Sequence, residues 1–376
     1  MKIKKTKVLT LVGTRPEIIK LSRVISKLDN NCDHVLVHTG QNYDYELNEI
    51  FFDDMEIRKP DFFLDIKSDS ALKSISNVIH KLDDLLDELK PDAFLVLGDT
   101  NSACGVIAAK KKKIPIFHME AGNRCFDMRV PEEVNRILVD HMSDINMPYT
   151  DIAREYLIAE GIRKDHIVKT GSPMNEVLSY YSDKIKTSNI LDTLKLEKNK
   201  YFIVSSHREE NLDYDDNFKK FLEILNQLDE RYKIPVLVSV HPRLKKKINS
   251  ISNPLSKNII FSKPFGFSDY INLMINSKAV LSDSGTITEE ASILSLNAIN
   301  LRDAHERPEG SENAVCISTG MDVNRVINAI EVTCKKNIKA RKIVDDYDVD
   351  DVSSVILRTI LSYIDHVNKY TWRKSL

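Results

Sequence analysis

The chain has 376 residues, which suggests two domains at about 150 residues per domain. Hydrophobic residues make up 42% and charged residues 29% of it, as in an ordinary globular protein. The 54 lysines and arginines nearly balance the 56 aspartates and glutamates. The resulting formal net charge of -2 argues against a nucleic-acid partner, which would require a clustered excess of cations.

The N-terminal sequence does not have the pattern of a signal peptide. The apolar run behind the basic first residues ends within about six residues at Gly13, which is too short for the core of such a peptide. No stretch approaches the roughly 18 consecutive apolar residues of a membrane-spanning helix. We therefore expect a cytoplasmic protein that does not insert into a membrane.

The five cysteines predict neither disulfides nor a metal centre. They are odd in number, lie far apart and form no C-x-x-C pair. The sequence also lacks H-E-x-x-H, and no P-C-x-x-C follows His118-x-Glu120. We expect reduced thiols and no catalytic metal.

Short runs rich in β-branched residues alternate with helical stretches along the whole chain. In chain order, the expected strands of a first series cover residues 8–12, 34–38, 93–97, 115–118, 144–147 and 167–170. Those of a second series cover residues 201–205, 236–240, 258–262, 279–282, 298–301 and 314–317. Such alternation predicts two α/β units of similar size, each with a buried parallel sheet.

Two helical stretches help to define the organisation. Apolar side chains recur at spacings of three and four within residues 71–89, as in a helix that connects two parallel strands. Residues 349–370 near the C-terminus also form a helical pattern, which could pack back on the first domain. We place the domain boundary between residues 171 and 200.

Glycines directly after strands indicate where a ligand would bind. The chain has only 11 glycines, and Gly13, Gly40, Gly98 and Gly285 all follow expected strands. A missing Cβ lets the backbone approach a ligand at the carboxyl ends of the strands. In an open α/β sheet this edge is the expected site.

Nucleotide-binding fingerprints that would imply a redox cofactor or an NTPase are absent. Neither G-x-G-x-x-G nor G-x-x-x-x-G-K-[ST] occurs, so we expect no NAD cofactor. Arg15 nevertheless stands at the start of a helix, where an anion would meet both its guanidinium and the helix dipole. An N-capping turn is the alternative interpretation.

The segment after residues 279–282 is a second candidate anion site. Ser284, Gly285 and Thr286 offer hydroxyls and backbone N–H groups to a diphosphate, and Glu290 could bind ribose hydroxyls. A capping box would place much the same residue types there, so both interpretations stay open.

Acids and histidines gather after the expected strands of both halves. They include Asp99, His118, Glu120, Glu132, His207 and His241. Each alone could be a helix cap or a buried, hydrogen-bonded histidine. Together they favour general acid and base catalysis.

Seven motifs in order carry a resemblance to a known family. They are Gly13-Thr-Arg-Pro-Glu, Gly98-Asp-Thr, Glu120-Ala-Gly, Pro131-Glu-Glu-x-Asn-Arg136, His207-Arg-Glu-Glu-Asn, Asp283-Ser-Gly and Glu306-Arg-Pro-Glu-Gly310. On these motifs the chain resembles the non-hydrolysing UDP-N-acetylglucosamine 2-epimerases nearly end to end. The resemblance implies a glycosyltransferase-B-like α/β fold, with two Rossmann-like domains, parallel sheets and an interdomain cleft. It also implies domains at residues 1–171 and 172–348, a C-terminal helix at 349–376, and a homodimer.

The same resemblance implies roles for individual residues. The catalytic residues would be Asp99, Glu120, Glu132 and His207. The substrate-binding residues would be Arg15, Lys20, Arg136, His241, Tyr270, Ser284, Gly285, Thr286, Glu290 and Arg307. The substrate would be a UDP-sugar, inverted at C2 by elimination and re-addition of UDP through a glycal, with no cofactor.

Departures from the glucosamine-type pattern suggest a particular branch. Asn42-Tyr43 replaces a His-Arg pair, and Asn123 to Val130 replaces the usual sugar-facing loop. With these departures the sequence resembles enzymes that convert UDP-2-acetamido-2,6-dideoxy-L-talose to UDP-N-acetyl-L-fucosamine for capsule or O-antigen synthesis. UDP-N-acetylglucosamine 2-epimerase is the alternative, followed by a UDP-sugar glycosyltransferase, a hydrolysing epimerase and a non-enzymatic sensor.

Overall fold

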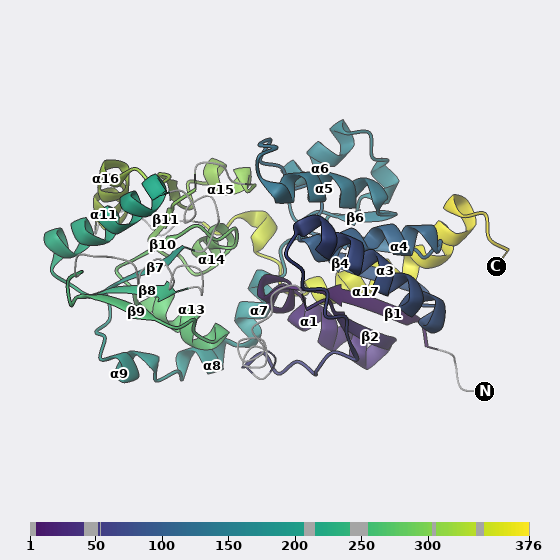
Figure 1. Cartoon of the computed structure of the whole chain (residues 1–376), viewed down its shortest axis with the longest axis horizontal. Coiled ribbons are helices and arrows are strands. Elements are labelled where there is room, and N and C mark those ends of the chain that lie inside the picture. The colour runs from purple at the N-terminus through teal and green to yellow at the C-terminus, as the bar shows by residue number, and fades with distance from the viewer. Residues whose placement is uncertain are drawn as a thin grey trace. The chain divides into compact units, whose positions relative to one another are not determined.

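The chain forms two compact α/β units. The computed structural model describes residues 5–40, 52, 54–206, 215–240, 255–302, 306–335 and 342–375. Unit 1 comprises Met1–Ser179 with Asp345–Leu376, and unit 2 comprises Tyr180–Val344. Each unit contains a parallel six-stranded sheet with helices around it (Figure 1). The predicted α/β class with two parallel sheets is confirmed, and the limits of the units differ by several residues from the domain limits expected from the sequence.

Unit 1 has the strand order β3-β2-β1-β4-β5-β6. Its strands are β1 (Lys7–Val12), β2 (Asp33–His38), β3 (Phe62–Phe63), β4 (Ala93–Leu97), β5 (Ile116–Met119) and β6 (Ile145–Met147). Its α-helices are α1 (Arg15–Asn31), α3 (Ala71–Leu89), α4 (Val106–Lys111), α5 (Pro131–Met142), α6 (Asp151–Ala159), α7 (Met174–Tyr180) and α17 (Val352–His366). Short turns of 3₁₀-helix cover η1 (Asn101–Gly105), η2 (Lys164–His166) and η3 (Asp345–Tyr347), and a π-helical turn, η4 (Val367–Thr371), follows α17.

Unit 2 has the strand order β12-β11-β10-β7-β8-β9. Its strands are β7 (Phe202–Ser206), β8 (Val236–Val240), β9 (Ile259–Ser262), β10 (Ala279–Ser282), β11 (Ala298–Asn300) and β12 (Ile317–Ser318). Its helices are α8 (Ser182–Lys186), α9 (Ile190–Leu194), α11 (Asp215–Tyr232), α13 (Phe267–Asn276), α14 (Ile287–Ile293), α15 (Pro308–Glu312) and α16 (Val323–Thr333). Both sheets therefore have the strand order of a Rossmann fold.

The cores lie between sheet and helices. Every residue of β4 is buried, as expected for a central parallel strand that is covered on both faces. In unit 1, Phe94 and Val96 of this strand belong to one apolar cluster with Leu82 of α3. In unit 2, Phe202 of β7 and Phe221 of α11 belong to the corresponding cluster. Apolar burial on this scale is the main force that holds each sheet and its helices together.

The strand order places a ligand-binding edge in each unit. It reverses between β1 and β4 in unit 1 and between β7 and β10 in unit 2, and each of these pairs is parallel. Ligands of doubly wound sheets bind at the carboxyl ends of the strands beside such a reversal. In unit 1, Arg15 and Asp99 follow the two strands in question, and in unit 2 Ser284 follows β10.

The C-terminal segment packs on unit 1. Helix α17 lies against α1. Glu176 of α7 accepts hydrogen bonds from the hydroxyl (2.5 Å) and the backbone N–H (2.8 Å) of Ser353. Gly171 has a φ of +78° and a Cβ there would lie 2.6 Å from Val349, so this crossing of two chain segments requires glycine.

Three details of the expected strands were wrong. Residues 167–170 form only an isolated bridge between Asn146 and Ile167, because Pro148 has no N–H to continue the ladder. The last strand is Ile317–Ser318 instead of 314–317, because the turn after α15 extends to Ala314, which has a φ of +49°. The two-residue strand β3 was not predicted. Among the described residues, no helix is both long and apolar enough to cross a membrane.

Candidate active site

The turn after β1 depends on Gly13 and Glu17. A Cβ on Gly13 would lie 2.0 Å from the hydroxyl oxygen of Ser102, so a larger residue would require rearrangement. The carboxylate of Glu17 accepts hydrogen bonds from the backbone N–H groups of Gly13 (2.5 Å) and Thr14 (3.3 Å). It also accepts one from the hydroxyl of Thr100 (2.7 Å). Glu17 therefore joins the turn after β1 to the segment after β4.

Arg15 begins α1 directly behind this turn. Burial raises the pKa of Glu17 to about 7, although the hydrogen bonds act in the opposite direction. Below that pH, the carboxyl group is mostly neutral. An anion at the helix N-terminus would then face the backbone N–H groups and Arg15 without a full opposing charge.

Lys20 and Glu120 form an ion pair between α1 and the segment after β5. The Lys20 Nζ lies 2.6 Å from Glu120 Oε2 and 5.4 Å from the centre of the Tyr149 ring. The Lys20 side chain is only 3% exposed, and that of Glu120 is 14% exposed. Glu120 also has a left-handed backbone with a φ of +62°, which is rare outside glycine and often marks a functional constraint.

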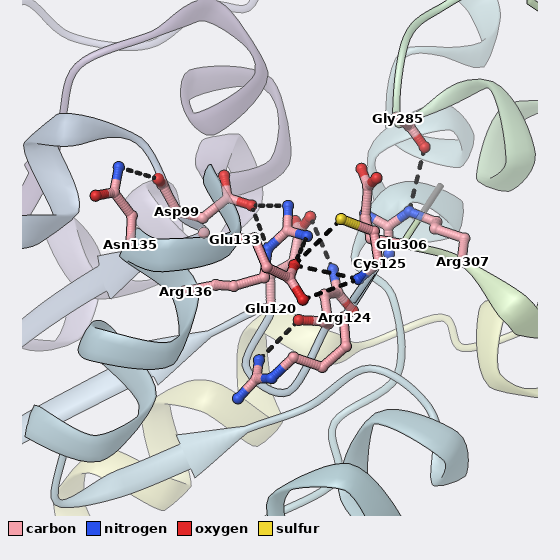
Figure 2. A network of polar contacts seen from close by, with 12 residues as sticks. Asp99, Glu120, Arg124, Cys125, Glu133, Asn135, Arg136, Gly285, Glu306 and Arg307 are labelled. Carbon is pink, nitrogen blue, oxygen red and sulfur yellow. Dashed lines mark hydrogen bonds and ion pairs between the residues drawn. The ribbon is translucent and has the colours of Figure 1, made fainter. Parts of the chain in front are cut away.

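Asp99 and Arg136 form a second pair, between the end of β4 and α5. The Nε and Nη2 of Arg136 lie 3.0 and 2.5 Å from Asp99 Oδ2, and Asn135 Nδ2 donates to the backbone carbonyl of Asp99 (3.0 Å) (Figure 2). The Arg136 side chain is buried, whereas that of Asp99 is one-quarter exposed. The guanidinium thus orients a carboxylate that keeps some access to solvent.

Glu132 and Glu133 lie side by side in the first turn of α5 but differ in environment. Glu132 is half-buried, whereas Glu133 is 1% exposed and lies 2.7 Å from Arg136 Nη1. Burial alone would raise the pKa of Glu133, but hydrogen bonds and the charge of Arg136 outweigh it and lower this pKa. Glu133 is not among the site residues predicted from the sequence. Its i to i+3 spacing from Arg136 is the signal that could have found it.

His118 belongs to a buried network behind these acids. Its Nε2 lies 2.9 Å from the carbonyl oxygen of Gly98, and its Nδ1 lies 2.9 Å from Asp140 Oδ1. Asp140 also pairs with Arg124 (2.7 Å) and accepts hydrogen bonds from the N–H of Gly122. All of these side chains are buried. His118 thus supports the loops that carry the acids, in keeping with the structural alternative from the sequence.

In unit 2, the turn after β10 is internally hydrogen-bonded. The Ser284 and Thr286 hydroxyls are 2.9 Å apart, and Ser206 at the end of β7 donates to Asp283 (2.8 Å). Arg307 donates from Nε to the carbonyl oxygen of Gly285 (3.2 Å).

The acids of α14 next to this turn are buried. Arg307 Nη2 lies 3.0 Å from Glu289 Oε2, and both side chains are almost completely buried. Glu290 is 8% exposed, and Tyr270 on α13 is half-buried. Arg307 thus fixes the shape of the turn at Gly285.

Several predicted positions cannot be placed. The catalytic candidate His207, the binding candidate His241 and the branch-specific pair Asn42 and Tyr43 lie outside the described residues. Within unit 1, Arg15, Lys20, Asp99, Glu120, Glu132 and Arg136 all lie at or near the carboxyl edge of the sheet. Within unit 2, Ser284, Gly285 and Thr286 belong to one turn, and Arg307 at the start of α15 donates a hydrogen bond to it. Their catalytic and binding roles remain predictions.

One group among the described residues has the composition of a metal site. The ligand atoms of Asp165, His166 and His366 all lie within 4.8 Å of one another. Asp165 is already paired with Arg163, and the group contains none of the predicted site residues. We therefore assign it no part in the reaction.

Comparisons with known proteins agree on one family. The family model described as UDP-N-acetylglucosamine 2-epimerase matches residues 26–361. The structure of UDP-N-acetylglucosamine 2-epimerase from Rickettsia bellii is 50% identical, with a TM-score of 0.92 over 98% of this chain and 100% of that chain. The enzyme from Methanocaldococcus jannaschii, in complex with UDP-GlcNAc and UDP, is 33% identical, with a TM-score of 0.88 over 95% of this chain and 100% of that one. UDP-2,3-diacetamido-2,3-dideoxy-D-glucuronate 2-epimerase from Pseudomonas aeruginosa is 32% identical over 89% of this chain and 94% of its own length.

Proposed function

Since this chain belongs to the UDP-N-acetylglucosamine 2-epimerase family, we propose that it inverts C2 of a UDP-linked 2-acetamido sugar. The observation that carries the proposal is the pair of acids after neighbouring strands of unit 1. Asp99 follows β4 and Glu120 follows β5, and each acid is held by a buried cation. Two separately oriented carboxylates at one sheet edge suit a reaction that removes a proton from one face of a carbon and returns it to the other.

The chemistry explains why a leaving group must take part. C2 of a nucleotide sugar has no adjacent carbonyl, so simple deprotonation would leave an unstabilised carbanion. In the proposed reaction a carboxylate takes the C2 proton while the C1–O bond breaks, which gives a 2-acetamidoglycal and UDP. Re-addition of UDP at C1, with a proton delivered to the other face of C2, completes the inversion. Atoms and charges balance without a redox cofactor.

The leaving diphosphate requires positive charge and N–H donors. Each unit offers one candidate of this kind, which is Arg15 at the start of α1 in unit 1 and the turn at Ser284 to Thr286 in unit 2. Preorganised groups of this kind can contribute several kcal/mol to the stabilisation of developing charge, about 3 kcal/mol for one well-placed donor. Glu290 is our candidate for binding the ribose.

The similar proteins support UDP-N-acetylglucosamine as the first candidate substrate, with UDP-N-acetylmannosamine as its product. The R. bellii and M. jannaschii proteins are both named for that sugar, and the latter was solved with it bound. This choice replaces the L-talose derivative that Asn42-Tyr43 and the 123–130 loop suggested in the sequence, because these two similar structures are named for UDP-N-acetylglucosamine. The P. aeruginosa relative, named for a different 2-acetamido sugar, indicates that the family scaffold is not tied to one substrate.

A second candidate, UDP-2-acetamido-2,6-dideoxy-L-talose, rests on the loop itself. Phe126 and Met128 are 69% and 62% exposed. An apolar side chain there could contact the C6 methyl group of a 6-deoxy sugar in place of a hydroxymethyl group. One such contact gives about 10- to 200-fold discrimination between substrates.

A direct comparison of both sugars tests the substrate. The purified chain would be incubated with each UDP-sugar, and the products would be separated and identified by NMR. We expect UDP-N-acetylmannosamine from UDP-N-acetylglucosamine, with the higher kcat/KM for that pair. A kcat/KM that is larger for the L-talose derivative would transfer the assignment to the second candidate. Release of free sugar, or transfer to an acceptor, would refute epimerisation.

A further inference from the structure

The loop of residues 123–130 and the catalytic candidate Asp99 share one buried carboxylate. We infer that Glu133 is a positioning residue that couples the conformation of this loop to the orientation of Asp99 through Arg136. The inference rests on the proposed function, since it assigns Asp99 to the reaction and the loop to the sugar.

The loop side of this connection consists of backbone hydrogen bonds. Glu133 Oε1 accepts from the N–H of Phe126 (2.9 Å), and its two oxygens lie 3.1 and 3.2 Å from the N of Cys125. The Cys125 thiol also lies 3.3 Å from Glu133 Oε2 (Figure 2). These contacts hold the two residues at the centre of the loop.

The backbone at Phe126 explains why such an anchor is needed. Phe126 has a φ of +57°, in the left-handed region that a bulky residue rarely adopts. A conformation of this kind persists when surrounding contacts over-determine it. With the backbone held, the Phe126 ring projects outward and meets the ring of Tyr156 on α6 edge to face, with the ring centres 5.2 Å apart.

The other side of the connection is the ion pair with Arg136. Arg136 Nη1 lies 2.7 Å from Glu133 Oε2, and its Nε and Nη2 are the groups that orient Asp99. The guanidinium is planar and rigid, so a shift of Arg136 relative to the Glu133 carboxylate also shifts it relative to the Asp99 carboxylate. A movement of the loop therefore reaches Asp99 through one buried carboxylate and one buried guanidinium.

Cys125 offers a readout that is independent of catalysis. Burial raises the pKa of its thiol, and the adjacent Glu133 carboxylate raises it further by accepting its hydrogen bond and by its charge. If Glu133 holds the loop, its replacement should make this thiol more exposed and more acidic. The buried Cys32 in the same unit serves as an internal reference for general loosening of the fold.

The experiment compares the wild-type chain with Glu133→Gln, Glu133→Asp and the control Val134→Ala, whose side chain is exposed on the same helix. We would measure kcat, KM and the pH profile of Cys125 alkylation, with the labelled peptides quantified by mass spectrometry. For Glu133→Gln we expect a higher KM, faster Cys125 labelling with a profile moved to lower pH, and a kcat reduced about tenfold to a hundredfold. That range follows because a misplacement of about 1 Å can cost roughly a hundredfold in rate.

Glu133→Asp keeps the charge beside Arg136. It therefore allows the inference to be tested even if Glu133→Gln does not fold. Its shorter side chain should not reach both the loop and the guanidinium, and we expect faster Cys125 labelling with a smaller loss of kcat. Wild-type labelling and kinetics in Glu133→Asp would show that Glu133 merely neutralises Arg136 and would overturn the inference. An equal rise in labelling at Cys32 would also overturn it. A wild-type chain without epimerase activity would refute the proposed function instead, because the Cys125 labelling still tests whether Glu133 holds the loop.

Discussion

The buried carboxyl of Glu17 should make the stability of unit 1 depend on pH. Its pKa is about 7 in the folded chain, against 4.5 for the free side chain, because burial disfavours the charged form. The folded state therefore binds this proton more tightly than the unfolded state does. The stabilisation is complete below pH 4.5 and is lost as the pH rises through 7. At about 1.4 kcal/mol per pKa unit, the difference corresponds to about 3 kcal/mol.

The perturbation is Glu17→Gln, which resembles the protonated form. Its amide oxygen can still accept from the N–H groups of Gly13 and Thr14, and its NH₂ group can donate to the Thr100 hydroxyl. The free energy of unfolding of the variant, relative to wild type, should therefore rise by about 2.5 kcal/mol between pH 5 and pH 8.

Urea unfolding at the two pH values measures this difference. The single tryptophan, Trp372, lies in unit 1, so its fluorescence reports on the unit that contains Glu17. Glu155→Gln is the control, because Glu155 is exposed on α6 of the same unit and its replacement should leave the pH dependence unchanged. An identical pH dependence in wild type and Glu17→Gln would refute the reasoning.

Three further predictions concern activity, binding and packing. Asp99→Asn and Glu120→Gln should each lower kcat by about a hundredfold or more while UDP affinity is largely kept, as steady-state kinetics and calorimetry with UDP would show. Arg15→Ala should instead lower the affinity for UDP in the same calorimetric titration. An unchanged affinity would remove Arg15 from the anion site. Gly310→Ala should destabilise unit 2 by about 1–3 kcal/mol, because its Cβ would lie 2.1 Å from the Cγ2 of Thr288. A melting temperature equal to that of wild type would contradict this.

The central strands could be predicted because their residues are buried on both faces. The expected strand 93–97 coincides with β4, and the expected helix 71–89 coincides with α3, where the apolar spacing is regular. Strand ends and edges were harder to predict. The failure at residues 167–170 depends on a proline in the neighbouring segment, which periodicity along one segment cannot reveal.

The acids of the site were visible in the sequence, but their pairing was not. Asp99, Glu120 and Arg136 stand in motifs after strands, and strand order alone brings them to one edge. That Lys20 on α1 reaches Glu120, 100 residues further along the chain, depends on the three-dimensional arrangement of α1 and the segment after β5, which no local pattern encodes. Glu133 illustrates the same limit, because its spacing from Arg136 is visible in the sequence, whereas its hydrogen bonds to backbone N–H groups of the loop are not.

The most direct test of C2 epimerisation is the fate of the C2 proton. The chain would be incubated with UDP-N-acetylglucosamine in deuterium oxide, and the reaction would be followed by ¹H NMR. We predict that UDP-N-acetylmannosamine forms with deuterium at C2, and that Asp99→Asn or Glu120→Gln slows this exchange. A product that fully retains the C2 proton would contradict the proposed elimination and re-addition.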